Sequence, residues 1–226
     1  MKTVTIHQPN YLPYIGLFNK VKQAEVFIIL DTALFSKNSV TNRNKIRTPD
    51  GWTYLTIPIE RKNHQKPIKD VDLPKNNKWM ENHWKSIMTS YGKARHFKEY
   101  RAFFEELYKS SFAKLAEINM KIIGYLLEQF NIDVEIIKSS SLDIGPNLRK
   151  TDLLIKILKV VNAGVYLSGE GGKNYLELDK FKENRIEIEF QRFEHPKYEQ
   201  QFSGFVPYLS AIDLLFNVGK KSSGVI

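Results

Sequence analysis

The segment near the amino terminus holds the densest group of side chains able to do chemistry. It reads His7-Gln-Pro-Asn-Tyr-Leu-Pro-Tyr-Ile-Gly16 and offers an imidazole and two amides in a loop stiffened by prolines. The loop joins an expected strand at residues 4–8 to an expected helix at 15–24. Ligands of open α/β sheets bind at such strand-to-helix corners, and the helix start suits phosphate. We therefore predict a functional site centred on His7, although a lone histidine of this kind is more often structural.

A carboxylate is expected at the same edge of the sheet. The apolar run Val26–Leu30 is typical of a central strand covered on both faces, and Asp31 follows it directly. An acidic side chain there suits orienting His7, binding a sugar hydroxyl or holding Mg²⁺. A turn or helix-capping role is the structural alternative, and the sequence does not decide between them.

Two further segments are suited to anions. Residues 37–47 mix Lys37 and Arg43 with asparagines, and arginine grips phosphate oxygens through two nitrogens. A solvated loop is the alternative. Residues 168–175 read Ser-Gly-Glu-Gly-Gly-Lys-Asn-Tyr after an expected strand, so their backbone amides suit an anion-binding nest. The spacing of a Walker A loop is absent.

The remaining motifs mainly exclude classes of enzyme. His195-Pro-Lys-Tyr198 places an imidazole and a phenol in a turn, where binding and structural roles are equally supported. No histidine pair has the zincin spacing, and no G-x-S-x-G nucleophile motif occurs.

The order of expected elements predicts the fold class. Strand, helix and strand within residues 4–30 form a βαβ unit, which implies parallel pairing. Helical patterns dominate residues 78–130. A last helix is expected within residues 209–218, with Ser210 preceding its first turn. We predict one α/β domain over residues 1–226, with a Rossmann-like parallel or mixed sheet, flanking helices and a helical insert at 78–130.

Composition sets further limits on function. The chain has 226 residues, a net charge of +9 and no cysteine, which excludes disulfides, thiolate metal sites and a cysteine nucleophile. Residues 1–113 hold 19 Lys+Arg against 10 Asp+Glu, whereas residues 114–226 are balanced, so an anionic partner is expected at the first half. No apolar run approaches the ~20 residues of a membrane span, and we expect the protein in the cytoplasm.

Five motifs carry a family resemblance. They are His7-Gln-Pro-Asn-Tyr-Leu-Pro, Phe35-Ser-Lys with Asn42-Arg-Asn44, Gly51-Trp52 with Leu55-Thr-Ile-Pro58, Tyr166-Leu-Ser-Gly169 and His195-Pro-x-Tyr198. With them the chain resembles the WbqC-like protein family over nearly its full length. The resemblance implies a role in bacterial O-antigen and surface-polysaccharide synthesis, with transfer of glycine to an amino sugar.

A more distant similarity concerns the nucleotidylyltransferases that hold ATP with an H-x-G-H motif. The strand, proline-rich loop, glycine and helix at the start of the chain look like the opening of those enzymes. The motif itself is absent, because Leu17 follows Gly16 and His7 lies too far upstream.

For acyl transfer to the amine of a nucleotide-linked amino sugar, the expected catalytic residues are His7 as base, Asp31 orienting it, and Gln8 and Asn10 as oxyanion donors. The predicted substrate-binding residues are Tyr11, Lys37, Asn42, Arg43, Asn44, Ser168, Gly169, Gly171, Gly172, Tyr175, His195 and Tyr198. No cofactor or metal is predicted, a need for Mg²⁺ is left open, and the expected ligands are a nucleotide-sugar and an amino-acid donor, with tRNA as a possible carrier. Two alternatives stay open: an ATP-dependent ligase or nucleotidyltransferase-like enzyme, and a non-catalytic module that binds a nucleotide-sugar or RNA.

Overall fold

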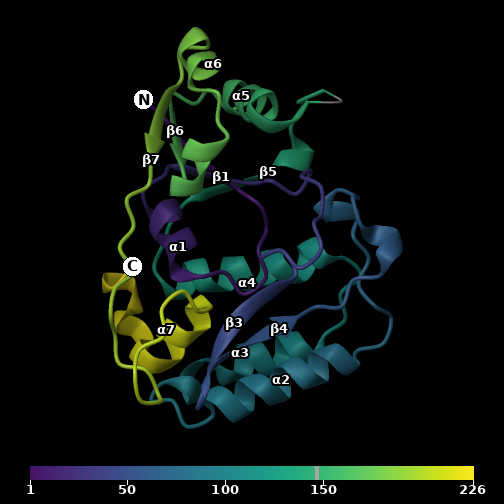
Figure 1. Cartoon of the computed structure of the whole chain (residues 1–226), viewed down its shortest axis with the longest axis vertical. Coiled ribbons are helices and arrows are strands. Elements are labelled where there is room, and N and C mark those ends of the chain that lie inside the picture. Colours follow the sequence, from purple (N-terminus) through teal and green to yellow (C-terminus); the bar gives the residue numbers. More distant parts are fainter. Residues whose placement is uncertain (146–147) are drawn as a thin grey trace.

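A five-stranded parallel sheet organises the molecule (Figure 1). The computed structural model describes residues 1–145 and 148–226. The strands are ordered β5 (Glu135–Lys138), β2 (Val26–Ile29), β1 (Thr3–His7), β6 (Val165–Ser168) and β7 (Glu187–Phe190), and neighbouring strands are parallel. In chain order, β2 and β5 lie on one side of β1, and β6 and β7 follow on its other side. This is a Rossmann-like order, and the predicted fold class is confirmed.

Helices cover both faces of this sheet. The helices α1 (Ile15–Lys22) and α4 (Leu115–Gln129) pack in one apolar cluster with Phe27 and Ile29 of β2. The helices α5 (Lys150–Val160) and α6 (Leu178–Glu183) pack in a second cluster with Val26 and Ile28 from the opposite face of the same strand. Successive residues of a strand point to opposite faces, which explains why the run Val26–Ile29 is apolar throughout.

Three successive helices occupy the segment predicted to be helical. They are α2 (Lys78–Tyr91), α3 (Phe97–Lys109) and α4. The last helix, α7 (Ala211–Val218), begins after Ser210, whose Oγ accepts from the backbone N–H of Ile212 at 3.4 Å. Its Phe216 ring lies 5.3 Å from that of Phe104 on α3, between ring centroids. Within the described residues, no helix has the length and apolar character needed to cross a bilayer. The prediction of a single domain with a helical insert stays a prediction.

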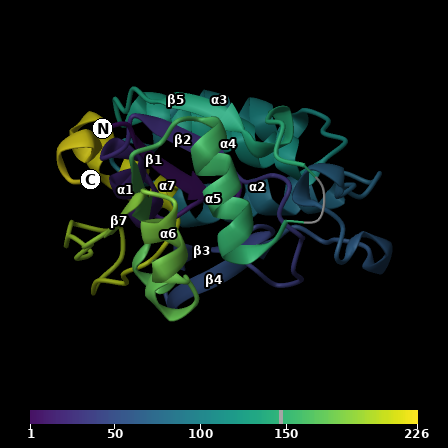
Figure 2. The ribbon, with the colours of Figure 1, turned by 90° about the horizontal axis from the view of Figure 1, so that it is seen from above.

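A β-hairpin includes part of residues 37–47, for which a solvated loop was the alternative to an anion site. Its strands are β3 (Arg43–Thr48) and β4 (Gly51–Thr56), paired antiparallel. On β3 the side chains of Asn44 and Ile46 are buried while Arg43 and Lys45 are partly exposed. Burial therefore alternates along this part of the strand, but the sequence does not reveal it because the buried Asn44 is polar. Seen from above, the hairpin lies on the side of the molecule away from β5 (Figure 2).

Short 3-10 turns complete the structure. They are η1 (Arg61–Asn63), η2 (Ile68–Asp70), η3 (Ser139–Ser141), η4 (Glu170–Asn174) and η5 (Gly219–Gly224). Two of them, η3 and η4, directly follow the strands β5 and β6, and therefore lie at the carboxyl edge of the sheet.

Candidate functional site

The order of the strands places a crevice at the end of β1. The chain leaves β1 toward β2 on one side, while β6 is added later on the other. Ligands of doubly wound sheets bind at the carboxyl ends of two strands that diverge in this way. Here β1 ends at His7 and β6 ends at Ser168. Two cavities open beside these residues.

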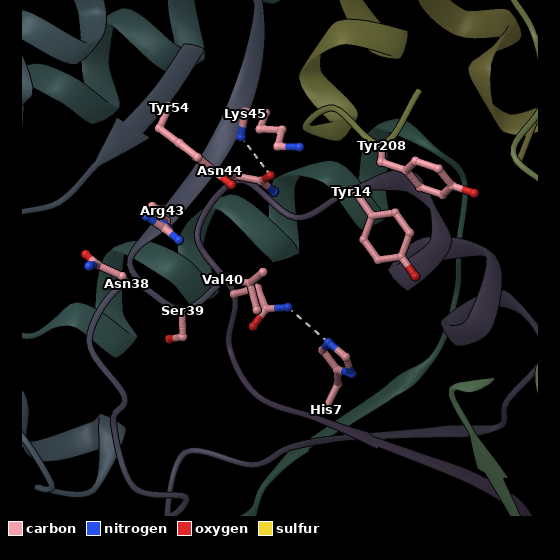
Figure 3. A pocket seen from close by; sticks show the side chains of 11 residues that line it. His7, Tyr14, Asn38, Ser39, Val40, Arg43, Asn44, Lys45, Tyr54 and Tyr208 are labelled. Atoms are coloured by element: carbon pink, nitrogen blue, oxygen red, sulfur yellow. Dashed lines mark hydrogen bonds between the residues drawn. The ribbon is translucent and has the colours of Figure 1, made fainter. Parts of the chain in front are cut away.

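The first, which we name the hairpin cavity, has a volume of about 540 Å³. It lies between the loop after β1 and the hairpin (Figure 3). The guanidinium carbon of Arg43 lies 4.4 Å from the centre of the Tyr54 ring, and Lys45 Nζ lies 4.1 Å from that of Trp52. The lining is His7, Asn10, Tyr14, Asn38, Ser39, Val40, Arg43, Asn44, Lys45, Tyr54 and Tyr208. Two cations and three amides make this cavity suited to phosphate oxygens.

The second, the sheet-edge cavity, has a volume of about 380 Å³ and lies over the ends of β1 and β6. Its lining is Ile6, His7, Tyr14, Lys20, Tyr166, Ser168, Gly169, Glu170, Gly171, Gly172, Tyr175, Gln191, Phe193 and Tyr208. Three side chains line both cavities: His7, Tyr14 and Tyr208. The two cavities are therefore neighbours, and the His7 imidazole stands at their junction.

Each ring nitrogen of His7 has a different neighbour. The Nδ2 of Asn10 donates to Nε2 at 3.0 Å, as drawn in Figure 3. The Nδ1 lies 3.3 Å from the Nζ of Lys20. Burial, and to a smaller extent the charge of Lys20, holds the pKa of His7 well below its usual value. The imidazole is thus neutral at neutral pH, and able to accept a proton or a hydrogen bond.

Lys20 is the main residue of the candidate site that sequence reasoning missed. It lies on α1 with only 3% of its surface exposed, and its Nζ donates to the carbonyl oxygen of Ile6 at 3.2 Å. Burial lowers the pKa of Lys20 to about 7. The sequence contains a signal for this position. Lys20 lies three residues after Leu17 and next to Val21, so the helical period places it on the apolar face of the helix, where an apolar side chain is expected.

The loop after β1 is held in place from two sides. Asn119 of α4, fully buried, donates through Nδ2 to the carbonyl oxygens of Pro9 at 2.7 Å and Thr41 at 2.8 Å. The Nδ2 of Asn44 on β3 donates to the carbonyl oxygen of Leu12 at 2.6 Å. These bonds fix the loop to the segment that leads into the hairpin, and so set the width of the hairpin cavity.

Gly16 makes room for the wall between the cavities. A Cβ atom at this position would lie 2.3 Å from the Tyr14 ring. The glycine therefore lets Tyr14 fold back over the start of α1, where the ring lines both cavities.

Many of the predicted site residues meet at this junction. Asn10, Arg43 and Asn44 line the hairpin cavity, and Ser168, Gly169, Gly171, Gly172 and Tyr175 line the sheet-edge cavity. The other predicted residues line neither cavity: Gln8, Tyr11, Asp31, Lys37, Asn42, His195 and Tyr198. Lys37 is exposed, and the partly buried His195 has its Nδ1 2.9 Å from the carbonyl oxygen of Pro196. The roles of the residues at the junction stay predictions.

The prediction that Asp31 orients His7 is wrong. Its carboxylate accepts from the Oγ of Ser139 at 2.8 Å, and from the Oγ and backbone N–H of Ser140 at 2.6 and 2.9 Å. Asp31 follows β2, which lies between β1 and β5, and its carboxylate is hydrogen-bonded to the turn after β5 and not to His7 at the end of β1. It fastens this turn to the sheet, and the neighbours of His7 are Asn10 and Lys20.

Three residues predicted to bind substrate instead direct polar groups to partners within the protein, and of these Tyr11 and Asn42 are buried and Tyr198 is partly buried. Tyr11 is fully buried, with its hydroxyl 2.8 Å from the Nδ1 of His83. Asn42 is buried and donates to the carbonyl oxygen of Ile57 at 2.9 Å. The hydroxyl of Tyr198 donates to Oδ2 of the buried Asp213 at 2.8 Å. Their polar groups satisfy buried partners, which a sequence pattern does not distinguish from ligand binding.

Other residues of the cavity walls were not among the individually predicted site residues. Asn38, Ser39, Val40, Lys45 and Glu170 lie within the two segments predicted to bind anions, whereas the rest lie outside them: Ile6, Tyr14, Tyr54, Tyr166, Gln191, Phe193 and Tyr208. Several come from the segment after β7, which reaches the site only through the tertiary fold. Within residues 1–145 and 148–226, no group of three or more His, Asp or Glu side chains is arranged to hold a metal ion.

Comparisons with known proteins find similar sequences. A family model described as the WbqC-like protein family matches residues 8–224, which include Tyr14 and Tyr208 of the three residues shared by the cavities, and His7 lies one residue before the match. The uncharacterized protein Rv1507c of Mycobacterium tuberculosis is 29% identical over 226 residues, covering 98% of this chain and 96% of that protein. No solved structure matches.

Proposed function

The chain belongs to the WbqC-like protein family, and we propose that it is an aminoacyl transferase acting on the amine of a nucleotide-linked amino sugar. The donor group is glycine and the process is bacterial surface-polysaccharide synthesis, as the family resemblance implies. The observation that carries the proposal is the junction of two cavities at His7, with the amine of Lys20 3.3 Å from its Nδ1. Two compartments that meet at His7, with Lys20 beside it in the sheet-edge cavity, suit a reaction between two substrates.

The chemistry requires a base that works near neutral pH. The acceptor amine is largely an ammonium in water and must lose a proton before it attacks the carbonyl of the donor. Burial keeps the His7 imidazole neutral and lowers the pKa of Lys20 to about 7. The pair therefore supplies an uncharged nitrogen where the reaction needs one, without help from Asp31.

The two cavities suggest how the substrates lie. Arg43 and Lys45 of the hairpin cavity suit the diphosphate of the nucleotide-sugar, whose sugar amine then reaches the junction at His7. The sheet-edge cavity, beside Ser168 and the glycines that follow it, takes the aminoacyl group. This placement uses two of the cations of the positively charged residues 1–113.

A ligase that activates glycine with ATP is the second candidate function. It is favoured by the position of the sheet-edge cavity at the carboxyl ends of β1 and β6, where parallel sheets bind nucleotides. Such an enzyme releases pyrophosphate or phosphate when it is given free glycine and ATP.

The test supplies isotope-labelled glycine in three forms to the protein with UDP-glucosamine as the acceptor probe. The forms are free glycine, free glycine with ATP, and glycyl-tRNA, and the product is detected by mass spectrometry. We expect glycyl-UDP-glucosamine from the tRNA-linked donor, and its loss in His7→Ala with calorimetric binding of UDP-glucosamine retained. His96→Ala is the matched control, because this histidine pairs with Glu99 at the surface. Product that requires ATP and free glycine supports the ligase, and no product from any donor contradicts both candidates.

A further inference from the structure

Lys20 has an unusual set of partners for a buried lysine. Its Nζ contacts the carbonyl oxygen of Ile6 and the Nδ1 of His7, at 3.2 and 3.3 Å. Within the part of the chain that the structure describes, it forms no ion pair with a carboxylate. A buried cation without a counter-charge is costly, so the uncharged amine is favoured. Because the side chain also lines the sheet-edge cavity, this amine borders space that a substrate can enter.

Two hydrogen-bonding arrangements are compatible with these positions. In the first, Asn10 Nδ2 donates to His7 Nε2, so Nδ1 carries the ring proton and donates to the lone pair of Lys20. In the second, the side-chain amide of Asn10 is flipped, so that its Oδ1 and Nδ2 exchange places. Its Oδ1, which is buried and without a partner among the described residues, then accepts from Nε2–H, and Nδ1 accepts from Lys20.

The second arrangement leaves the lysine nitrogen reactive. The Ile6 carbonyl and His7 Nδ1 are then both acceptors, and they take the two N–H bonds of the neutral amine. The remaining tetrahedral position of Nζ is its lone pair, which is then free for a group bound in the sheet-edge cavity that Lys20 lines. The orientation of one amide thus decides whether the lone pair of Lys20 is engaged by His7 or available to a ligand.

We propose that Lys20 is the catalytic base of the transfer, with His7 and the Ile6 carbonyl directing its lone pair into the sheet-edge cavity and Asn10 selecting the His7 tautomer. This assignment rests on the proposed function, and divides the roles within the pair: Lys20 contacts the acceptor amine, and His7 is a positioning residue. It differs from the sequence prediction, in which His7 itself takes the proton.

The step balances without a further reactant. The acceptor ammonium gives one proton to Lys20 Nζ, and the freed amine forms a C–N bond to the ester carbonyl carbon of the donor. The C–O bond to the donor then breaks, and the departing oxygen takes a second proton from the amine nitrogen. Lys20 releases its proton to solvent, so the products are an amide, a hydroxyl on the former carrier and one proton.

The other titratable groups that face Lys20 do not compete for this role. The sheet-edge cavity also holds Tyr14, Tyr166, Tyr175, Tyr208 and Glu170 besides His7. Burial raises the pKa of both Tyr14 and Tyr166, which keeps these phenols neutral at neutral pH. The carboxylate of Glu170 lies 3.8 Å from Lys173 Nζ and is largely exposed.

The activity test compares Lys20→Met and Lys20→Arg with wild type over pH 5.5 to 9. Arginine stays protonated throughout this range, whereas methionine fills the space without a titratable group. We expect both variants to lose about 100-fold or more in kcat/KM, as for removal of a general base. The activity of wild type should fall below about pH 7, and the residual activity of Lys20→Met should not show this fall. Lys20→Met should bind UDP-glucosamine with a Kd within about threefold of the wild-type value. Lys85→Met, at an exposed position on α2, is the control.

The outcomes separate the two proposals. Wild-type activity and pH profile in Lys20→Met would overturn the assignment of Lys20 and leave the transferase standing, whereas no transfer by wild type would overturn both. A readout independent of activity is the NMR titration of isotope-labelled lysine, with the Lys20 signal assigned by its loss in Lys20→Met. A midpoint near the value of about 7 is expected, and a midpoint above 10 would overturn the assignment.

Discussion

The Nδ1 of His7 lies 3.3 Å from the Nζ of Lys20, although the two residues belong to different elements. His7 ends β1 and Lys20 lies near the end of α1, the helix that crosses back over the sheet toward β2. The right-handed crossover therefore brings the last strand residue and a buried helix residue together. The site depends on how α1 packs, which makes the start of this helix a good place to perturb it.

Gly16→Ala should weaken substrate binding more than it weakens the fold. The new Cβ would lie 2.3 Å from the Tyr14 ring, whose outer atoms must then move into the cavities. We expect the Kd for UDP-glucosamine to rise about tenfold, equivalent to about 1.4 kcal/mol, measured by calorimetry. Gly124→Ala is the control, because a Cβ there meets no atom within 4 Å. Equal affinity in both variants would exclude this role for Gly16.

Arg43 and Arg47 lie on the same strand, but their replacement by methionine should affect different properties: substrate binding for Arg43 and stability for Arg47. The buried Arg47 donates to the carbonyl oxygens of Thr48, Gly51 and Ser203 at 2.6 to 2.7 Å. Arg47→Met should lower the free energy of unfolding by about 3 kcal/mol in urea denaturation, since hydrogen bonds to charged groups contribute about 1.5–3 kcal/mol. Arg43→Met should leave unfolding nearly unchanged and weaken UDP-glucosamine binding about tenfold or more. Reversed effects would contradict the assignment of Arg43 to the hairpin cavity.

Asp31→Ala tests the structural role of this carboxylate. Removal leaves the hydroxyls of Ser139 and Ser140 without their acceptor, and should lower the free energy of unfolding by about 2 kcal/mol. At a temperature where the variant is folded, its transfer rate should stay within about threefold of wild type, since Asp31 does not contact His7. A rate loss of 100-fold in the folded variant would restore Asp31 to the catalytic machinery.

His83 should make the protein sensitive to acid. Burial lowers its pKa from 6.5 to about 4, so the unfolded chain binds a proton at this residue more readily than the folded chain. The contribution of neutral His83 to the free energy of unfolding is fully present above pH 6.5. It is lost as the pH falls from 6.5 through about 4, and the complete loss amounts to about 3 kcal/mol.

His83→Gln should remove this part of the pH dependence. The lowered pKa values of His7 and His195 act in the same direction in both proteins, so the difference between the two unfolding curves isolates His83. Urea denaturation at pH 7 and pH 4.5 measures it. Parallel losses of stability in wild type and variant would exclude His83 as the cause.

The fold was more predictable than the site because its signals are local. The apolar run Val26–Ile29 and the loop after His7 suffice to predict a βαβ unit and a corner at the sheet edge. The partners of a polar residue depend on contacts between segments distant in sequence, and the Asp31 carboxylate accepts from Ser139, 108 positions later, and not from His7. Tyr11 illustrates the same limit: it belongs to the distinctive loop, yet its hydroxyl contacts a helix residue 72 positions later.

A crystal structure with UDP-glucosamine tests the central claim most directly. If the two cavities form one site, the diphosphate should contact Arg43 and Lys45, and the sugar amine should lie within hydrogen-bond distance, about 3 Å, of His7 or Lys20. The same ligand bound elsewhere, with its amine away from His7 and Lys20, would contradict the account.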